Sequence, residues 1–272
     1  MHHLIEVPAG DQPELRIDAL WAAGAVGIEE RAGVIIAAFD QDHPPTDLAE
    51  SLGGAIREVA DDVGLDAWRE HFVAQEAGPF TVRAPWQVAP NNNGVAIDMV
   101  IDPGHSFGSG SHPSTRLALE LLASSVQLDD NVVDLGSGSG VLSIASLLVG
   151  AGHATAIDID PGAAAVAEQN AQANDVETKL AARTESAATT TGCFDLCIAN
   201  VTIDIHESIA PSVAANILAP RLLVAGILAG DQEHRAATAY ERQVIKRLRD
   251  GEWAALLLGD ADNPAATPDQ AP

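Results

Sequence analysis

The C-terminal two thirds of the chain alternates apolar, strand-like runs with helix-like segments, and this alternation constrains the fold more than any other feature of the sequence. Strands that alternate with helices of this length form a parallel sheet with helices on both faces. The expected strands are VAIDMVID (95–102), NVVDLG (131–136), HATAIDID (153–160), FDLCIAN (194–200) and RLLVAGIL (221–228). The expected helices are 113–125, 141–152, 161–175, 208–218 and 234–243.

The alternation ends differently. Residues 244–259, VIKRLRDGEWAALLLG, form two apolar runs around Asp250-Gly251, which is typical of a β-hairpin. We therefore predict an α/β fold with a doubly wound, Rossmann-like parallel sheet and a terminal antiparallel hairpin over residues 94–259.

A glycine-rich stretch, DLGSGSG, runs from Asp134 to Gly140 between an expected strand and an expected helix. A dinucleotide-binding loop needs the spacing G-x-G-x-x-G. Here the third position is Val141 or Ser143, depending on which glycine starts the count. This spacing disfavours an NAD-dependent dehydrogenase. The glycines still let the backbone approach a ligand closely, and the start of the helix offers free N–H groups to an anion.

The next expected strand ends at Asp158, where a carboxylate accepts hydrogen bonds from both hydroxyls of a ribose. In open parallel sheets the ligand lies at the carboxyl ends of the strands. The glycine loop and Asp158 together predict a ligand with a ribose and a small charged tail. A nucleoside that carries an amino acid fits this description.

The first 60 residues predict a small α+β domain with the order strand, helix, two strands, helix, strand, which is the split βαβ order of ferredoxin-like domains. Its helices are expected to be capped by Asp11 and Thr46. Residues 61–93 are interpreted as a linker whose short helix presents Trp68 and Phe72, and residues 260–272 as a disordered tail.

Composition limits the partners. Fourteen basic and 39 acidic residues give a net charge of −25, which repels nucleic acid phosphates and attracts a basic partner, although a salty or GC-rich host would produce the same composition. With no stretch of about 20 apolar residues and no leader, we expect a cytoplasmic protein without a membrane contact. Cys193 and Cys197 are expected to be buried, inert thiols, and no metal site is expected.

These motifs resemble a known class and a known family. The loop after one strand, an acid after the next and a terminal hairpin resemble class I S-adenosylmethionine-dependent methyltransferases. The stretch DPGHSFGSGSHPSTRLALELL, residues 102–122, is similar to DPGxAFGTGxHPTT of the ribosomal protein L11 methyltransferase family. FDLCIANVTIDIHESIAP, DGEWAALLLG and the Pro85-Trp86 dipeptide add support.

The resemblance implies that the small domain recognises a basic ribosomal protein and that the large domain methylates its lysine side chains and N-terminal amine. Carried over by position, the contacts to S-adenosyl-L-methionine are Thr115, Gly136, Asp158 and Asn200, with Asn200 also catalytic. The glycine loop adds Asp134 and Gly138 to the expected cofactor contacts. The structural alternatives are helix capping for Thr115 and Asp158 and a turn residue for Asn200.

Some positions depart from the family pattern. Ser109, Ser111 and Ser114 replace threonines, His105 replaces a small or apolar residue, and VTID follows Asn200 where the family more often has ILA. His105 and His112 either relay a proton or pack and hydrogen-bond within their loop.

Two alternatives stay open: a methyltransferase of the same fold that acts on another protein lysine or a small amine, and a catalytically silent cofactor-fold module. The sequence predicts neither the number of methyl groups added nor the oligomeric state.

Overall fold

A computed structural model of the chain describes residues 2–10, 13–25, 27–31, 33–39, 45–59, 74–89, 96–102 and 112–259. The chain divides into two compact units, one of residues 1–73 with 104–107 and one of residues 74–103 with 108–272. Each unit is described by itself.

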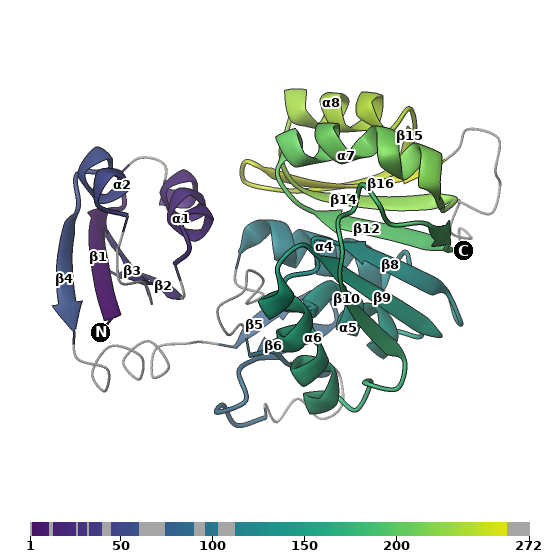
Figure 1. The fold of residues 1–272 in the computed structure, drawn as a ribbon, viewed down its shortest axis with the longest axis horizontal. Coiled ribbons are helices and arrows are strands. Elements are labelled where there is room, and N and C mark those ends of the chain that lie inside the picture. Colours follow the sequence, from purple (N-terminus) through teal and green to yellow (C-terminus); the bar gives the residue numbers. More distant parts are fainter. Residues whose placement is uncertain are drawn as a thin grey trace. The chain divides into compact units, whose positions relative to one another are not determined.

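The N-terminal unit is an antiparallel sheet with the strand order β2-β3-β1-β4 and two helices (Figure 1). Its core consists of alternate residues of the strands, such as Ile5, Val7 and Ile35, packed with Leu20 and Ala49 of the two helices. Because side chains alternate between the faces of a strand, both helices cover the same face. The elements are β1 (His2–Pro8), α1 (Pro13–Ala22), β2 (Gly27–Arg31), β3 (Val34–Phe39), α2 (Thr46–Ser51) and β4 (Ala55–Val59).

These elements follow the predicted order, and the ferredoxin-like assignment stays an interpretation. The predicted cap at Thr46 is wrong, because α2 begins at Thr46 and its N-cap is Pro45. The predicted cap at Asp11 and the linker helix with Trp68 and Phe72 lie outside the described residues.

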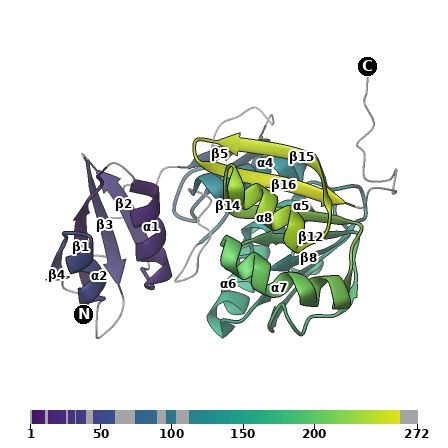
Figure 2. The ribbon, with the colours of Figure 1, turned by 90° about the horizontal axis from the view of Figure 1, so that it is seen from above.

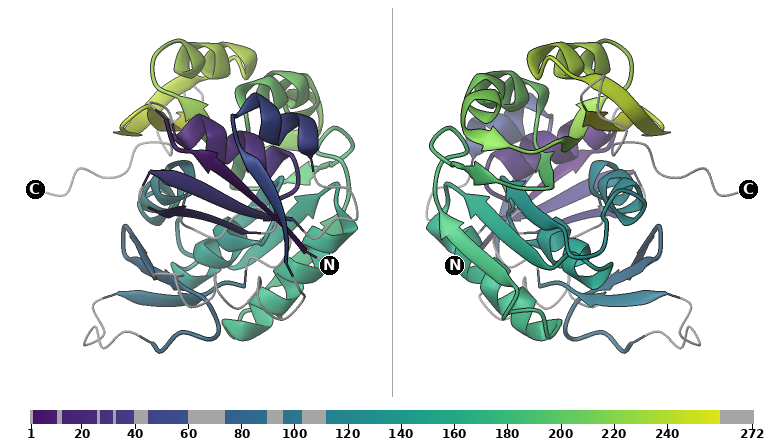
Figure 3. Two further views of the ribbon diagram at one scale, coloured as in Figure 1. Left: turned by 90° about the vertical axis from the view of Figure 1, so that its left-hand side faces the viewer. Right: turned by 90° about the vertical axis from the view of Figure 1, so that its right-hand side faces the viewer.

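The C-terminal unit contains a seven-stranded sheet with the order β10-β9-β8-β12-β14-β16-β15. The first five strands are parallel, and β16 and β15 add the antiparallel hairpin. This confirms the predicted fold class, and Figure 3 shows the yellow-green hairpin at one margin of the sheet. The strands are β8 (Asn131–Leu135), β9 (His153–Asp158), β10 (Leu180–Thr184), β12 (Leu196–Asn200), β14 (Arg221–Leu228), β15 (Gln243–Asp250) and β16 (Trp253–Gly259).

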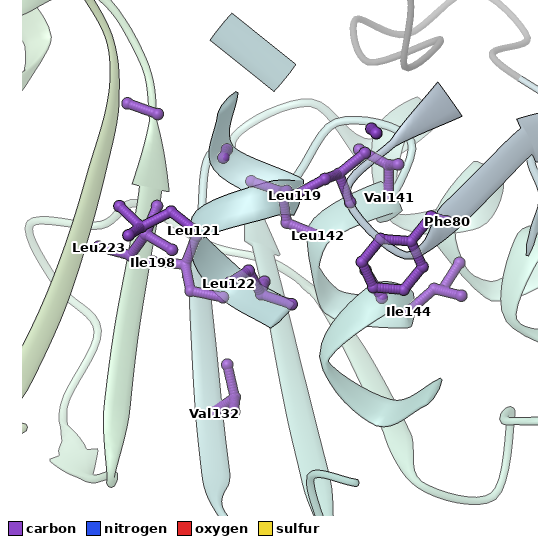
Figure 4. Packing of buried hydrophobic residues seen from close by; sticks show 14 of the residues in the cluster. Phe80, Leu119, Leu121, Leu122, Val132, Val141, Leu142, Ile144, Ile198 and Leu223 are labelled. Atoms are coloured by element: carbon purple, nitrogen blue, oxygen red, sulfur yellow. The ribbon is translucent and has the colours of Figure 1, made fainter. Parts of the chain in front are cut away.

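Helices cover both faces of this sheet. One hydrophobic cluster joins α4 (Pro113–Ala123), α5 (Val141–Leu148) and α6 (Pro161–Ala173) to one face. A second cluster joins α7 (Ile203–Asn216) and α8 (Asp231–Ala239) to the other, and Figure 2 looks down on this second layer. The close-up in Figure 4 shows Phe80, Leu121 and Ile198 among the buried side chains of the first cluster. Each such side chain contributes about 1.5–3 kcal/mol by leaving water.

Several elements differ from the sequence prediction. Residues 75–83, assigned to the linker, contain β5 (Gln75–Ala77) and β6 (Phe80–Arg83), which form a separate sheet with β7 (Ile97–Val100). Helix α7 begins five residues earlier than predicted, and α8 begins and ends earlier. Strand β10 and the two-residue strands β11 (Gly192–Cys193) and β13 (Ile217–Leu218) were not predicted. No helix in the described part of the chain is both long and apolar enough to span a membrane.

Candidate cofactor site

The register of the parallel strands places the predicted site residues at one edge of the sheet. Leu135 of β8 pairs with Ile157 of β9 on one side and with Ala199 of β12 on the other. The next residue along each strand is Gly136, Asp158 or Asn200. Three of the predicted cofactor contacts therefore lie side by side where the strands end. In open parallel sheets, ligands bind at this edge.

The glycine loop folds back over the end of β9. The backbone N–H groups of Gly136 and Ser137 donate to Ile157 O at 2.8 and 3.0 Å. Gly136 has a φ of +73°, and a Cβ there would lie 2.8 Å from Cγ1 of Val201. A larger residue would be strained at this positive φ, and its Cβ would crowd the Val201 side chain, so this close approach favours glycine.

Asp158 joins the loop to the next helix. Its Oδ2 accepts a hydrogen bond from Gly138 N at 2.9 Å, and its Oδ1 accepts one from Asp160 N at 3.0 Å. Asp160, not Asp158, caps α6, because its side chain accepts from Gly162 N at 2.8 Å. The capping alternative for Asp158 is therefore wrong. A carboxylate has about four lone-pair sites, so each oxygen of Asp158 can accept one more hydrogen bond.

Asp134 has a structural position beneath the loop. It is 1% exposed, and its Oδ2 accepts hydrogen bonds from Ser143 N at 3.1 Å and from Ser143 Oγ at 2.7 Å. Ser143 lies in the first turn of α5, whose N-cap, Gly140, has no side chain. Asp134 thus supplies the missing acceptor for a free N–H of the helix start. Burial raises its pKa to about 7, against the opposing effect of the Ser143 hydrogen bonds.

Asn200 and Thr115 meet although 85 residues separate them. Asn200 Nδ2 donates to Thr115 Oγ1 at 3.3 Å, and Thr115 is fully buried in the first turn of α4. The Oδ1 atom of Asn200 is also buried, and it has no hydrogen-bond partner among the described residues. A buried amide oxygen without a donor is costly unless a ligand supplies one.

His112 is the N-cap of α4. Its Nδ1 accepts from Ser114 N at 3.2 Å and lies 2.7 Å from Ser114 Oγ, and its ring contacts Trp253 edge to face with centroids 4.6 Å apart. These contacts match the hydrogen-bonding alternative for His112. They also show that Thr115 does not cap α4. His105 lies outside the described residues.

Sequence reasoning missed a buried pair that supports the segment after Asn200. His206 of α7 is fully buried. Its Nε2 donates to Ala225 O at 2.9 Å, so its Nδ1 accepts from the hydroxyl of Tyr240 at 3.0 Å. Burial lowers the pKa of His206 to about 4 and raises that of Tyr240. His206 is therefore neutral near pH 7.

Two further residues of this edge were not singled out from the sequence. Ser137, inside the glycine loop, is 7% exposed, and its hydroxyl has no hydrogen-bond partner among the described residues. Ile159 directly follows Asp158 and is 77% exposed. The sequence did contain a signal for Ile159. The isoleucine stands between two aspartates, just after the buried residues of β9, where an apolar side chain is exposed.

The two cysteines differ. Cys197 is buried in β12, and burial raises its pKa to about 12, as expected for an inert thiol. The prediction is wrong for Cys193, which is exposed. Cys193 lies in the two-residue strand β11, before the chain enters the sheet core.

These features together define the class of the protein. A sheet of five parallel strands and an antiparallel hairpin, with a glycine loop after β8, a carboxylate at the end of β9 and a buried amide at the end of β12, is a class I methyltransferase fold. The family model described as ribosomal protein L11 methyltransferase (PrmA) matches residues 13–260. The chain belongs to the ribosomal protein L11 methyltransferase family.

Relatives agree with this assignment. The ribosomal protein L11 methyltransferase of Thermus thermophilus is 38% identical over 250 residues, 89% of this chain and 93% of the relative. The Geobacter sulfurreducens protein of the same name is 35% identical over 78% of this chain and 73% of its own length. Among solved structures, the ribosomal protein L11 methylase from Lactobacillus delbrueckii subsp. bulgaricus superposes with a TM-score of 0.60 at 24% identity, covering 67% of this chain and 95% of its own, which supports the fold.

The chain is thus a methyltransferase, and S-adenosylmethionine is its methyl donor. The structure fits this cofactor. The hydroxyl of Ser137 in the glycine loop is buried without a hydrogen-bond partner among the described residues, so a ligand can supply one, and a Cβ at Gly136 would lie 2.8 Å from Cγ1 of Val201.

Proposed function

We propose that the chain transfers methyl groups to the lysine side-chain amines, the N-terminal amine, or both, of a large-subunit ribosomal protein of the L11 type. The observation that carries the proposal is the buried, unpartnered Asn200 Oδ1 at the end of β12. An amide oxygen there accepts a hydrogen bond from an amine. The choice of L11 as the acceptor is supported by two relatives that are named ribosomal protein L11 methyltransferase.

The residues at the sheet edge divide the cofactor between them. Asp158, through the lone pairs that Gly138 and Asp160 leave, holds the ribose hydroxyls. Gly136 and Gly138 allow close backbone approach, and Thr115 contributes from the start of α4 to the amino-acid end of the cofactor. The exposed side chain of Ile159 offers an apolar surface to the flat base.

Asp134 acts on the cofactor indirectly in this proposal. Its Oδ2 is already occupied by two bonds to Ser143, so it shapes the loop by fixing the start of α5. This revises the direct contact that the sequence analysis assigned to Asp134.

The obstacle to the reaction is protonation of the acceptor. A lysine amine with a pKa of about 10.4 is neutral in only about one molecule in 2,500 near pH 7, which corresponds to about 4.6 kcal/mol. When bound, S-adenosylmethionine supplies an activated methyl group and a positive charge that, with desolvation, lowers the pKa of a nearby amine. The neutral amine nitrogen would displace the thioether from the methyl carbon, the carbon–sulfur electron pair would leave on sulfur, and the proton of the methylated amine would pass to water.

The protein contributes alignment. Thr115 Oγ1 fixes the Asn200 amide through Nδ2, which leaves Oδ1 to orient an amine hydrogen and so the nitrogen lone pair. Alignment of two reactants supplies several kcal/mol of a barrier reduction. His206 bonds both Ala225 O and the hydroxyl of Tyr240, and so ties α7, which begins soon after Asn200, to β14.

The charge of the chain favours the proposed acceptor. A net charge of −25 attracts basic proteins and repels free nucleic acid. We place the reaction in the cytoplasm, where such an acceptor is synthesised, and assign recognition of the acceptor to the N-terminal unit.

The test is transfer of labelled methyl groups from S-adenosylmethionine to a ribosomal-protein extract. The proposal predicts one labelled band that comigrates with purified L11 and releases methylated lysine or a methylated N-terminal residue on hydrolysis. Label in a different protein would favour the alternative acceptor. Cofactor binding without any transfer would favour the silent module.

A further inference from the structure

Helix α6 presents two asparagines, one turn apart, to the backbone of a strand outside the main sheet. Asn174 Oδ1 accepts from Val100 N at 2.8 Å, and its Nδ2 donates to Val100 O at 2.6 Å. Asn170 Oδ1 accepts from Asp102 N at 2.8 Å, and its Nδ2 donates to Asp102 O at 2.9 Å. The two side chains thus bond the backbone at the end of β7 and two residues beyond it, in place of a neighbouring strand.

The geometry of a helix explains why this works. Among the described strands, β7 pairs with β6 alone, so its other backbone edge needs partners. Two residues of a strand span about 6.6 Å. Four residues of a helix span about 6 Å. Asparagines at positions i and i+4 therefore match alternate strand residues.

The two asparagines differ in the acceptor of their second amide hydrogen. Asn174 Nδ2 donates it within α6, to Asn170 O at 2.7 Å. Asn170 Nδ2 donates it to Ser139 O at 2.9 Å, inside the glycine loop. Asn170 is 2% exposed, and its bond to Ser139 O is buried. One amide thus joins the end of β7 to the loop.

The Ser139 carbonyl is a sensitive point of that loop. Ser139 lies between Gly138 and Gly140, which have φ values of +51° and +78°, and glycine peptides rotate with little steric resistance. Asp158 holds the loop at Gly138 N, and Asn170 holds it at Ser139 O. α6 is close here, since a Cβ at Gly140 would lie 2.9 Å from Cβ of Ala167.

We infer that Asn170 is a positioning residue that fixes the Ser139–Gly140 peptide for cofactor binding and couples it to the backbone of Asp102. Asn170 acts through the loop and touches no substrate. The inference rests on the proposed use of the glycine loop by S-adenosylmethionine. Asn174 makes the same strand contacts without the loop contact, so it is the matched control.

The first test compares Asn170→Ala with Asn174→Ala. Both variants lose a pair of hydrogen bonds to the backbone of residues 100–102, and both are expected to unfold at lower urea concentration than wild type. Calorimetric titration with S-adenosylmethionine should show a dissociation constant raised about tenfold or more in Asn170→Ala and changed by less than about twofold in Asn174→Ala. Equal effects, or none in Asn170→Ala, would overturn the inference.

The second test needs no variant, in case Asn170→Ala does not fold. Hydrogen exchange in the wild-type protein is followed by NMR with and without S-adenosylmethionine. The amide of Asp102, bonded to Asn170, should exchange more slowly with cofactor present, whereas the amide of Val100, bonded to Asn174, should not change. Equal responses at both amides would contradict the coupling. A wild-type protein that does not bind the cofactor would overturn the proposed function, and the inference with it.

Discussion

The carboxylate of Asp158 accepts a hydrogen bond from the backbone N–H of Gly138 at 2.9 Å, so the end of β9 and the glycine loop are joined directly. The same carboxylate holds Asp160 N through its other oxygen. This arrangement fixes the rotamer of Asp158 with a free lone pair on each oxygen. A preorganised acceptor loses little entropy when it binds a ribose.

Replacement of Asp158 by alanine is expected to weaken cofactor binding. A hydrogen bond to a charged group contributes about 1.5–3 kcal/mol, and about 1.4 kcal/mol is tenfold in affinity. Calorimetry should therefore show a dissociation constant about 10 to 100 times higher. The control is Asp160→Ala, which removes the α6 cap and costs about 0.5–2 kcal/mol of stability. Unchanged affinity in Asp158→Ala would refute the ribose contact.

Asn200→Ala is expected to reduce turnover more than cofactor binding. The variant removes the amide oxygen that orients the acceptor, so kcat should fall about tenfold or more. The dissociation constant of the cofactor should stay within about threefold. Thr115→Val, which removes the hydroxyl that holds Asn200 Nδ2, should lower kcat in the same direction but less. Equal turnover in wild type and Asn200→Ala would show that Asn200 is not catalytic.

Asp134 makes stability depend on pH. Its pKa is about 7 in the folded chain and 3.8 ordinarily, so between these values the folded chain holds a proton that the unfolded chain has released. The free energy of unfolding therefore falls as pH rises through this window, by up to about 1.4 kcal/mol per pH unit. Urea unfolding of wild type and Asp134→Asn across pH 5 to 8 should show a difference that changes with this slope and levels off above pH 7. A constant difference would contradict the raised pKa.

His206 gives the opposite dependence. Its folded pKa of about 4 lies below the ordinary 6.5, so the unfolded chain binds the extra proton between these values. The stability that neutral His206 contributes is lost as pH falls from about 6.5 to about 4. Compared with His206→Gln, wild type should lose up to about 1.4 kcal/mol per pH unit in this window. If both proteins respond alike, His206 is not buried in its neutral form.

The sequence predicted the parts of the fold that its hydrophobic pattern encodes. The fully buried strands β8, β12 and β14 were located because continuous apolar runs mark strands covered on both faces. Strand β10 was missed because LAART lies at the sheet margin, half exposed, without such a run. Helix α7 was started too late because its first turns mix the buried Ile203 and His206 with Asp204 and Glu207.

The site, too, was predictable where strand positions determine it and unpredictable where helix packing does. Adjacent strands in a parallel sheet bring their carboxyl ends together, so Gly136, Asp158 and Asn200 could be predicted as neighbours from their positions alone. The contacts of Asn170 with Asp102 and Ser139 could not, since they depend on where α6 packs. The structural role of Asp134 was missed for a similar reason: its carboxylate points to Ser143, which no local pattern reveals.

The most direct test of the account is intact-mass spectrometry of purified L11 after incubation with this protein and S-adenosylmethionine. The account predicts that the mass of L11 rises by whole methyl groups, with fragmentation placing them on lysine or N-terminal amines, and that Asn200→Ala slows the rise. An unchanged L11 mass, under conditions in which the cofactor is bound, would contradict the assignment of this acceptor.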